Sequence, residues 1–372
     1  MKKIRISGAG PVGLACAAWL LQKNPNLPIE LYDRLSEDDR IFETADTRGI
    51  AISQGSKLLL ESIGAWHPNA QAIHTIHVSH QGHFGRAIVR REELGQEALG
   101  YVVRYADIHL ALRQALRSIA RSASQFQWHF SHTEEIAPQQ DQATVLIHAE
   151  GGLFKDQDER PIHRDYEQSA IVGWVKTNQI NSHYAWERFT PEGPLALLPS
   201  HRGEQFLNLV WCAKPDSVQE RLQISPESFI QALQNAFGTR AGEFLEVGDL
   251  RAYPLGLNAR EEIVEGHQVW IGNAAQTLHP VAGQGLNLGL RDAHTLAEEL
   301  LMPDSIANCL ARYAAKRQQD RRVTIRSTDF LARIFTSKMK PVIWARGLAL
   351  SALQLMPPIK SKITRQMMFG QR

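Results

Sequence analysis

The sequence predicts an α/β fold from three features of the chain. Residues 2–34 have the pattern of a short strand, a glycine-rich turn, an alanine-rich helix and a second strand. Residues 168–175 and 196–211 are rich in strand-forming residues, with a turn at 190–194 between them. A helix begins near Gln284, and the end of the chain is helical. We therefore expect a Rossmann-like unit, an inserted mixed β-sheet and a helical C-terminus.

The turn in the first unit has the spacing of a dinucleotide-binding loop. Gly8 permits a tight turn, Gly10 lets the backbone approach a pyrophosphate, and Gly13 lets the helix and the strand meet closely. The N-terminus of the following helix offers unpaired N–H groups to anionic oxygens. Asp33 follows the second strand, where a carboxylate accepts hydrogen bonds from an adenosine ribose. Together these residues predict a dinucleotide site.

Composition excludes several classes of function. The chain has 372 residues, of which 43% are hydrophobic and 22% charged, and its formal net charge is +2. This composition is typical of a globular protein, and so small a net charge indicates no nucleic-acid partner. Cys16, Cys212 and Cys309 lie far apart in apolar surroundings. They predict buried thiols in a reducing compartment, with neither a disulfide framework nor a metal site.

Two stretches of the sequence, one near each end, indicate where in the cell the protein is found. Met1, Lys2 and Lys3 lead straight into the first strand, without the pattern of a secretory signal. The most apolar stretch, 341–358, is interrupted by Arg346 and bounded by prolines, so it is too short and too polar to span a bilayer. We expect a cytoplasmic protein that can also lie at the periphery of the inner membrane.

The remaining elements follow from the same patterns. We expect a helix through 58–63, strands and turns over 72–103, a helix over 104–120, strands at 126–136 and 143–149, and an amphipathic helix over 225–237.

Four histidines, His74, His77, His80 and His83, recur at every third position. Side chains alternate along a strand, so the first and third would point to one face and the other two to the opposite face. This arrangement favours a polar hairpin at Gly82 over a metal site.

Residues 269–292 form the most specific stretch of the chain. A buried strand enters a glycine-rich loop bent by Pro280, and a helix follows from about Gln284. The positive end of such a helix stabilises negative charge, and a reduced flavin carries that charge near N1 and the C2 carbonyl. The location suits an isoalloxazine ring.

With this stretch the chain resembles the FAD-dependent aromatic hydroxylases of ubiquinone biosynthesis, in particular those similar to 2-polyprenyl-6-methoxyphenol hydroxylase, within the p-hydroxybenzoate-hydroxylase-like group A flavin monooxygenases. The resemblance covers nearly the whole chain. It rests on GAGPVG at 8–13, DTR at 46–48 with IAIS at 50–53, GYVV at 100–103, ERFTP at 187–191 with GPLALLP at 193–199, and VWIGNAAQTLHPVAGQGLNLGLRD at 269–292.

The resemblance implies an FAD-dependent monooxygenase that uses NAD(P)H and O2 to hydroxylate the aromatic ring of a polyprenylated phenol through a flavin C4a-hydroperoxide. It also implies which residues hold the cofactor: the first loop and its acid bind the ADP half, two arginines lie near the flavin and its phosphates, and the second motif surrounds the ribityl chain and the ring. The complete set is Gly8, Gly10, Pro11, Val12, Gly13, Asp33, Arg34, Arg48, Arg104, Gly272, Asn273, Pro280, Gly283, Gln284, Gly285 and Asn287.

The chain departs from the wider family at two places. Most of the group has an aspartate where Asn273 stands, although the ubiquinone subfamily looks similar here, with the amide and Gln276. The usual mid-chain Asp-Gly element is Glu150-Gly151, and the serine and arginine expected after it are missing. The second departure leaves the interaction with the nicotinamide open.

The family chemistry asks the protein to orient the ring, exclude water and stabilise charge on the flavin, so we name no catalytic residue. His279 is either an acid–base group or a structural residue beside Pro280, and we favour the structural interpretation. Two alternative functions stay open: a flavoprotein reductase on the same scaffold, and a non-catalytic FAD-binding member of a biosynthetic complex.

The chain is expected to divide into three parts. Residues 1–70, 100–160 and 255–335 would form the FAD-binding domain, 71–99 and 161–254 the substrate-binding sheet domain, and 336–372 a basic amphipathic helical segment. From Phe335 onward there are seven Lys or Arg residues and no Asp or Glu. Such a segment either lies on anionic lipid, docks on a partner of a ubiquinone-biosynthesis complex, or packs on the core, and we favour the first two.

Overall fold

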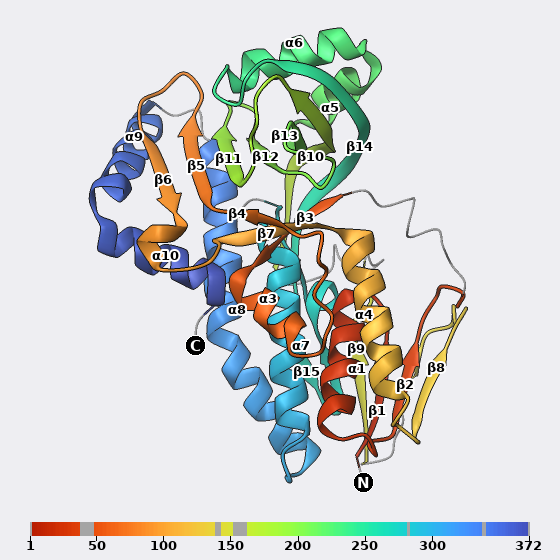
Figure 1. Ribbon diagram of the computed structural model, residues 1–372. Helices are drawn as coiled ribbons and strands as arrows, with labels where there is room; N and C mark the ends of the chain where they lie inside the picture. Colours follow the sequence, from red (N-terminus) through yellow and green to blue (C-terminus); the bar gives the residue numbers. More distant parts are fainter. Residues whose placement is uncertain are drawn as a thin grey trace.

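The structure is a computed structural model that describes residues 2–37, 48–137, 143–151, 162–280, 283–336 and 340–370. It has an α/β part that contains the N-terminus, a large β-sheet beyond it, and helices at the C-terminus that run along both (Figure 1). The predicted fold class is confirmed.

The first sheet has six strands in the order β15-β16-β9-β1-β2-β8. Five of them are parallel and the edge strand β15 is antiparallel. Their bounds are β1 (Lys3–Ser7), β2 (Ile29–Tyr32), β8 (Phe126–His129), β9 (Thr144–His148), β15 (Val264–Glu265) and β16 (Gln268–Trp270). The strand expected at 126–136 is shorter than predicted, because the chain turns at Ser131, whose φ is 54°.

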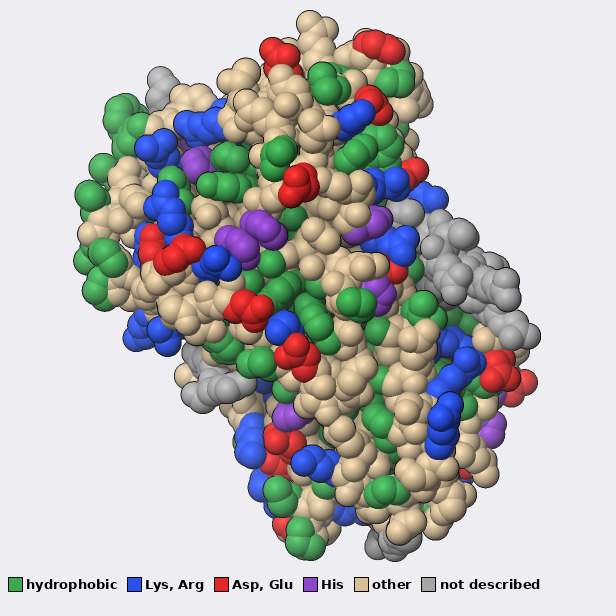
Figure 2. Space-filling view, in the orientation of Figure 1, with side chains coloured by type: hydrophobic (Ala, Val, Ile, Leu, Met, Phe, Trp, Pro, Cys, Tyr) green, Lys and Arg blue, Asp and Glu red, His purple; other side chains and the backbone are tan. Residues whose placement is uncertain are grey.

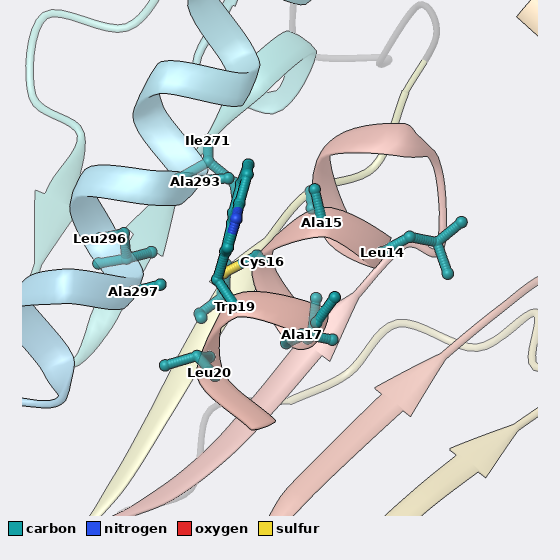
Figure 3. Packing of buried hydrophobic residues seen from close by; sticks show 14 of the residues in the cluster. Leu14, Ala15, Cys16, Ala17, Trp19, Leu20, Ile271, Ala293, Leu296 and Ala297 are labelled. Atoms are coloured by element: carbon teal, nitrogen blue, oxygen red, sulfur yellow. The ribbon is translucent and has the colours of Figure 1, made fainter. Parts of the chain in front are cut away.

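Three helices lie beside this sheet: α1 (Pro11–Lys23), α4 (Tyr105–Ala120) and α7 (Gln284–Leu300), and α1 packs on both of the others. Figure 3 shows Trp19 of α1 directed toward Ala293 and Leu296 of α7. The predicted role of Gly13 is confirmed, since a Cβ atom there would lie 2.0 Å from the carbonyl oxygen of Gly8.

The second sheet is mixed, with strand order β17-β14-β10-β13-β12-β11-β5-β6. Neighbouring strands are antiparallel except β11 and β5, which are parallel. The bounds are β5 (Thr75–His80), β6 (Arg86–Arg90), β10 (Ile162–Thr177), β11 (Tyr184–Phe189), β12 (Pro194–Pro199), β13 (Phe206–Ala213), β14 (Phe244–Ala259) and β17 (Gln276–Thr277).

One face of this sheet is covered by α5 (Pro215–Gln223) and α6 (Pro226–Phe237), whose apolar residues Phe229 and Leu233 pack on Trp211. The expected cap is present, because the Ser225 hydroxyl accepts a hydrogen bond from the Ser228 N–H. Sequence patterns did not predict α5. The opposite face of the sheet is left for the site described below.

Smaller elements join the two sheets. β3 (Gly49–Ser53), β7 (Gly100–Arg104) and β4 (Gln71–Ile73) form a three-stranded sheet beside α3 (Gln54–Glu61), and the 3₁₀ helices are η1 (Arg91–Leu94) and η3 (Gly272–Ala274). The chain ends in α8 (Ile306–Thr336), α9 (Lys340–Leu355) and α10 (Pro357–Phe369). None of the helices in the described part of the chain is long and apolar enough to cross a membrane.

Two sequence expectations need adjustment. The boundary expected at 254/255 lies inside the continuous strand β14, and β4 pairs with β7 rather than with the large sheet. His80 and His83 do not point to opposite faces: β5 ends at His80, and the turn at Gly82 and Gly85 stacks the two rings 4.5 Å apart. The three cysteines are free and buried, as predicted.

A buried network of charges and amides ties α7 and α8 to the loop after β16. Asp292 accepts hydrogen bonds from Arg317 and from the Gln276 amide, both at 2.7 Å. Arg317 also donates to Asp320 at 2.7 Å, and Arg321 donates to the side-chain oxygen of Gln276 at 2.7 Å. Asp292 is 0% exposed. Gln276 therefore fixes the loop of the second motif to the helices behind it.

Removal of the Asp292 charge tests this network. We expect Asp292→Asn to lower the free energy of unfolding by about 3–5 kcal/mol, because the buried Arg317 guanidinium then keeps only one of its two carboxylate partners, Asp320. Chemical denaturation of the purified protein measures the change. Glu246→Gln is the control: it breaks a surface pair with Lys176 and should cost roughly 0–1 kcal/mol. Equal effects of the two variants would contradict the role of the network.

Candidate functional site

A cavity of about 1620 Å³ is lined by residues of both large sheets, of the second motif and of the C-terminal helices. It extends from the glycine turn after β1 to an apolar chamber on the uncovered face of the second sheet. Most of the predicted cofactor residues meet around it. Three of them, Gly13, Arg104 and Gly272, are not among the residues that line it.

The N-terminus of α1 opens into the cavity. Gly8 adopts a left-handed φ of 101°, and a Cβ atom there would lie 2.8 Å from the backbone of Ala149. Gly10 is the N-cap of α1, no side chain caps the helix, and a Cβ atom on Gly10 would meet no protein atom within 4 Å. The helix N-terminus thus has no side-chain cap and has open space beside Gly10, which is the arrangement that an anionic pyrophosphate requires.

Asp33 lies where β2 ends and is 4% exposed. Its carboxylate accepts a hydrogen bond from the Leu35 N–H at 3.1 Å and pairs with the Arg113 guanidinium at 3.4 Å. Arg113 in turn lies over the ring of Trp128. Asp33 and its neighbour Arg34 both line the cavity, so the acid is held in place on the side where a ribose would lie.

The two predicted arginines differ in position. Arg48 lines the cavity, with its guanidinium 4.9 Å from the ring centre of Tyr253 and 5.4 Å from that of Tyr105. Arg104 instead binds Asp107 within the first turn of α4, with Nε 2.9 Å from Oδ2. Arg104 therefore acts here at a helix start, whereas Arg48 forms part of the cavity wall.

The N-terminus of α7 opens into the same cavity from the other side. Gly283 is its N-cap with a left-handed φ of 59°, no side chain caps the helix, and Gly285 has open space on its Cβ side. Asn287 holds this end in place, because it accepts from the Ser53 N–H at 2.8 Å and donates to the Ala51 and Gly283 carbonyl oxygens.

Other residues of the second motif line the cavity beside this helix. Asn273 and Pro280 are in contact with the cavity, and Gln284 donates a hydrogen bond of 3.4 Å to the Met367 carbonyl oxygen of α10. Gly272 instead packs on α1: its φ is 59°, and a Cβ atom would lie 3.0 Å from Val12. Gly272 therefore keeps the loop close to the first helix.

His279 is buried and joins the second motif to the large sheet. Its Nε2 lies 3.2 Å from the Gln168 side-chain oxygen, and its ring meets Tyr166 edge-on. Burial lowers the pKa of His279 to about 4, so the imidazole is neutral at physiological pH. These contacts support a structural role for His279 between the second motif and the large sheet.

Beyond the second motif the cavity becomes an apolar chamber. Its floor is the uncovered face of the large sheet, and one wall is formed by Leu350 and Leu353 of α9 and Met367 of α10. Sequence patterns assigned no role to two ionisable residues here, Lys360 and Glu187. Lys360 is tied to the protein by the Glu93 carboxylate at 2.7 Å and the Ile88 carbonyl oxygen at 2.9 Å.

Glu187 is different from Lys360. It has no hydrogen-bond or ion-pair partner among the described residues, and burial raises the pKa of its carboxyl group to about 7. The period of two in β11 could have revealed it, since Ala185 and Phe189 share its face and line the same cavity.

The cavity fits an FAD molecule on structural grounds. Two uncapped helix N-termini, a fixed carboxylate and glycines without neighbours on their Cβ side lie along one continuous space. The Glu150-Gly151 element lines it too, with Glu150 3.7 Å from His148. Residues 152–161, where the resemblance implies a serine and an arginine, lie outside the described residues.

Comparison with known proteins gives relatives along nearly the whole chain. The chain is 29% identical to the ubiquinone hydroxylase UbiL of Rhodospirillum rubrum over 98% of its own length and 89% of the relative's. It is 28% identical to the ubiquinone biosynthesis monooxygenase COQ6 of Danio rerio, over 97% of this chain and 88% of the other.

Solved structures share the fold. p-Nitrophenol 4-monooxygenase PnpA from Pseudomonas putida matches with a TM-score of 0.76 at 16% identity, over 100% of this chain and 99% of the other. HpxO of Klebsiella pneumoniae, complexed with FAD and uric acid, matches with a TM-score of 0.71 at 15% identity, over 99% of this chain and 96% of the other.

The phosphate end of the cavity can be tested with a single side chain. We expect Gly10→Val to lower the affinity for FAD by at least about tenfold, because the added carbons occupy the space in front of the α1 N-terminus. The flavin content of the purified protein and the Kd of its reconstitution measure the effect. Gly256→Val, on a strand where a Cβ atom makes only ordinary contacts, is the control and should retain FAD. Full flavin retention by Gly10→Val would be evidence against this site.

The family assignment rests on a direct match. A family model described as an FAD binding domain matches residues 142–327, which include the second motif and the N-terminus of α7. The matched region is half of the chain. The chain therefore belongs to the FAD-binding-domain family.

Proposed function

We propose that this protein is an FAD-dependent monooxygenase that hydroxylates the aromatic ring of a polyprenylated phenol in ubiquinone biosynthesis, with NAD(P)H as the reductant and O2 as the oxygen source. The observation that carries the proposal is the continuity of the cavity from the α1 N-terminus to the apolar chamber. The names of the full-length relatives support the substrate class.

The chamber matches a substrate with a long apolar tail. Its floor and walls consist mainly of aliphatic and aromatic side chains, among them Ile76, Val89 and Phe189 of the sheet and Leu331 of α8. A polar reactive end would lie toward the second motif, and an apolar tail would lie between the sheet and the C-terminal helices. Burial of a tail there is favourable by about 25 cal/mol per Å² of apolar surface removed from water.

FAD, when bound, supplies the redox chemistry that activates O2. The protein's own residues bind and orient the cofactor and enclose the substrate. Gly10 and Gly283 leave two helix N-termini free for anionic groups, and the Asn287 contacts keep the second of these in place. The apolar chamber excludes water from the reacting ring, which suppresses side reactions.

Oxygen incorporation tests the proposed reaction. We expect the FAD-loaded protein, given NAD(P)H and a short-tailed 2-polyprenyl-6-methoxyphenol, to add one hydroxyl group whose oxygen comes from ¹⁸O-labelled O2. Mass spectrometry of the product measures the label. Consumption of NAD(P)H without incorporation of label into any product would favour the reductase alternative and count against the monooxygenase.

We further propose that the protein works at the surface of the inner membrane, with α9 and α10 in contact with lipid. The inner sides of these helices pack on the protein: Leu350 contacts Ala87 and Phe189, and Met368 contacts Ile73. Their outer sides expose apolar residues at intervals of three or four, a set we call the apolar stripe: Trp344, Leu348, Ala352, Leu355, Ile359, Ile363 and Met367.

The exposure of the apolar stripe is large for such residues. Leu355 is 80% exposed, Trp344 63% and Leu348 62%. Figure 2 shows hydrophobic side chains gathered at the edge of the molecule where α9 and α10 lie. Ile363 and Met367 also line the cavity, so the stripe reaches the wall of the chamber. A surface helix with one apolar face is typical of interfacial membrane binding.

The basic residues of the C-terminal segment favour binding to a lipid bilayer less strongly than the sequence predicted. Of the basic residues in this segment whose side chains are described, Arg346 and Lys360 are buried, and Lys362 and Arg365 are exposed. The apolar stripe therefore provides most of the expected binding energy, and the exposed cations add a preference for anionic lipid.

Vesicle binding tests the membrane surface. We expect the protein to sediment with vesicles of phosphatidylglycerol and phosphatidylcholine, and the triple variant Trp344→Ser, Leu348→Ser, Leu355→Ser to bind at least about tenfold more weakly because it removes the most exposed apolar area. Ile180→Ser combined with Leu245→Ser, which changes one exposed residue in the loop after β10 and one in β14, is the control. Unchanged binding by the triple variant would refute a lipid-binding role of the stripe.

A further inference from the structure

Glu187 is the single carboxylic acid among the cavity-lining residues of the large sheet, within the described part of the chain. It belongs to a cross-strand row on the chamber floor, in which each residue is the register partner of the next. The row runs Val172, Val210, Ala196, Glu187, Val78 and Ala87. The two register partners of Glu187, Ala196 and Val78, are apolar, and so are the other three residues of the row.

No structural role accounts for this acid. Lys360, the other charged residue of the chamber, has a carboxylate partner, whereas Glu187 has none among the described residues. The burial of an unpartnered carboxylate is costly, so a side chain of this kind in a binding cavity is more often functional than structural.

Glu187 also lies in the part of the chamber that adjoins the second motif. Gln168 joins the second motif to the large sheet, because it contacts His279 and donates to the Glu192 carbonyl oxygen at 2.7 Å, immediately after β11. The loop that would surround the flavin is therefore held beside the turn that follows β11, and Glu187 lies in the half of β11 that leads into this turn. A ring bound between the loop and the floor would have this carboxylate beside it.

We propose that Glu187 is the base that accepts the proton of the substrate's phenolic hydroxyl group. The inference rests on the proposed function, because it takes a phenol as the substrate. The phenolic O–H bond breaks, the proton passes to a carboxylate oxygen of Glu187, and the electron pair remains on the phenolate oxygen. The phenolate is more electron-rich than the phenol and so reacts faster with an electrophilic oxygen. The carboxylic acid returns the proton when the neutral product forms.

The surroundings of Glu187 are suited to this transfer. A carboxyl group whose pKa is raised to about 7 is a stronger base than an ordinary glutamate, yet it is still deprotonated in part at neutral pH. The other titratable groups of the sheet that line the cavity are Cys212 and Tyr253. Burial and the Glu187 carboxylate raise the pKa of the Cys212 thiol, so that thiol stays protonated.

The test compares wild-type protein with Glu187→Gln and Glu187→Asp. In the wild type, the hydroxylation rate in a single turnover should rise with pH through about 7, because the base is active only when it is deprotonated. Glu187→Gln should react at least about 100-fold more slowly at neutral pH and lose this transition. Glu187→Asp should keep the transition at a reduced rate. Glu246→Gln, an exposed glutamate of β14, should behave as wild type.

A binding measurement separates this inference from the proposed function. Absorbance difference spectra with oxidised flavoprotein report whether the short-tailed substrate binds as the phenolate or as the phenol. We expect the phenolate in wild type above about pH 7, and the neutral phenol in Glu187→Gln until the pH approaches the ordinary phenol range near 10. The methyl ether of the substrate should bind equally to both proteins.

Failure of the proposed function and failure of the Glu187 assignment give different results. Absence of hydroxylation by the wild type would overturn the proposed function, while the spectra would still test Glu187. Hydroxylation with the same rate, pH profile and bound phenolate in wild type and Glu187→Gln would overturn the assignment of the base and leave the proposed function intact.

Discussion

The site depends on the close approach of two helix N-termini, which only residues without side chains permit. Gly13 lies against Gly8, and a Cβ atom on Gly289 of α7 would lie 2.8 Å from Val12 and 3.0 Å from Gly272. These contacts place the N-termini of α1 and α7 on one cavity, with neither helix capped by a side chain. The unpaired N–H groups that would weaken an isolated helix thus become the binding groups for an anionic cofactor.

The helices behind the cavity keep this arrangement rigid. Asp292, Arg317 and Gln276 join α7, α8 and the second motif through hydrogen bonds in which each polar group has a partner. A buried network of this kind specifies one geometry more than it adds net stability, because desolvation offsets most of the Coulombic attraction. The loop that would contact the flavin ring is held by the protein and not by its ligand.

The two faces of the large sheet have different roles: one stabilises the fold, and the other lines the proposed substrate site. One face packs on α6 through Trp211 and Phe229, and the other forms the chamber floor with Glu187 at its centre. The C-terminal helices complete the chamber with their inner residues and expose the apolar stripe on the outside. The same segment therefore encloses the chamber and presents an apolar surface to the surroundings, which fits a substrate that partitions into lipid.

The fold class, the first nucleotide-binding unit and the residues of both glycine motifs could be predicted from the sequence, because glycine spacing and hydrophobic periodicity are local properties of the chain. The sequence placed Gly10, Asp33, Arg48, Gly285 and Asn287 at a site that the structure assembles. The tertiary structure alone shows that Arg104 lies outside the cavity lining, that Lys360 is buried beside Glu93, and that Glu187 lies among apolar neighbours on the chamber floor. These facts depend on strand pairing and on contacts between distant segments, and periodicity within one segment does not specify them.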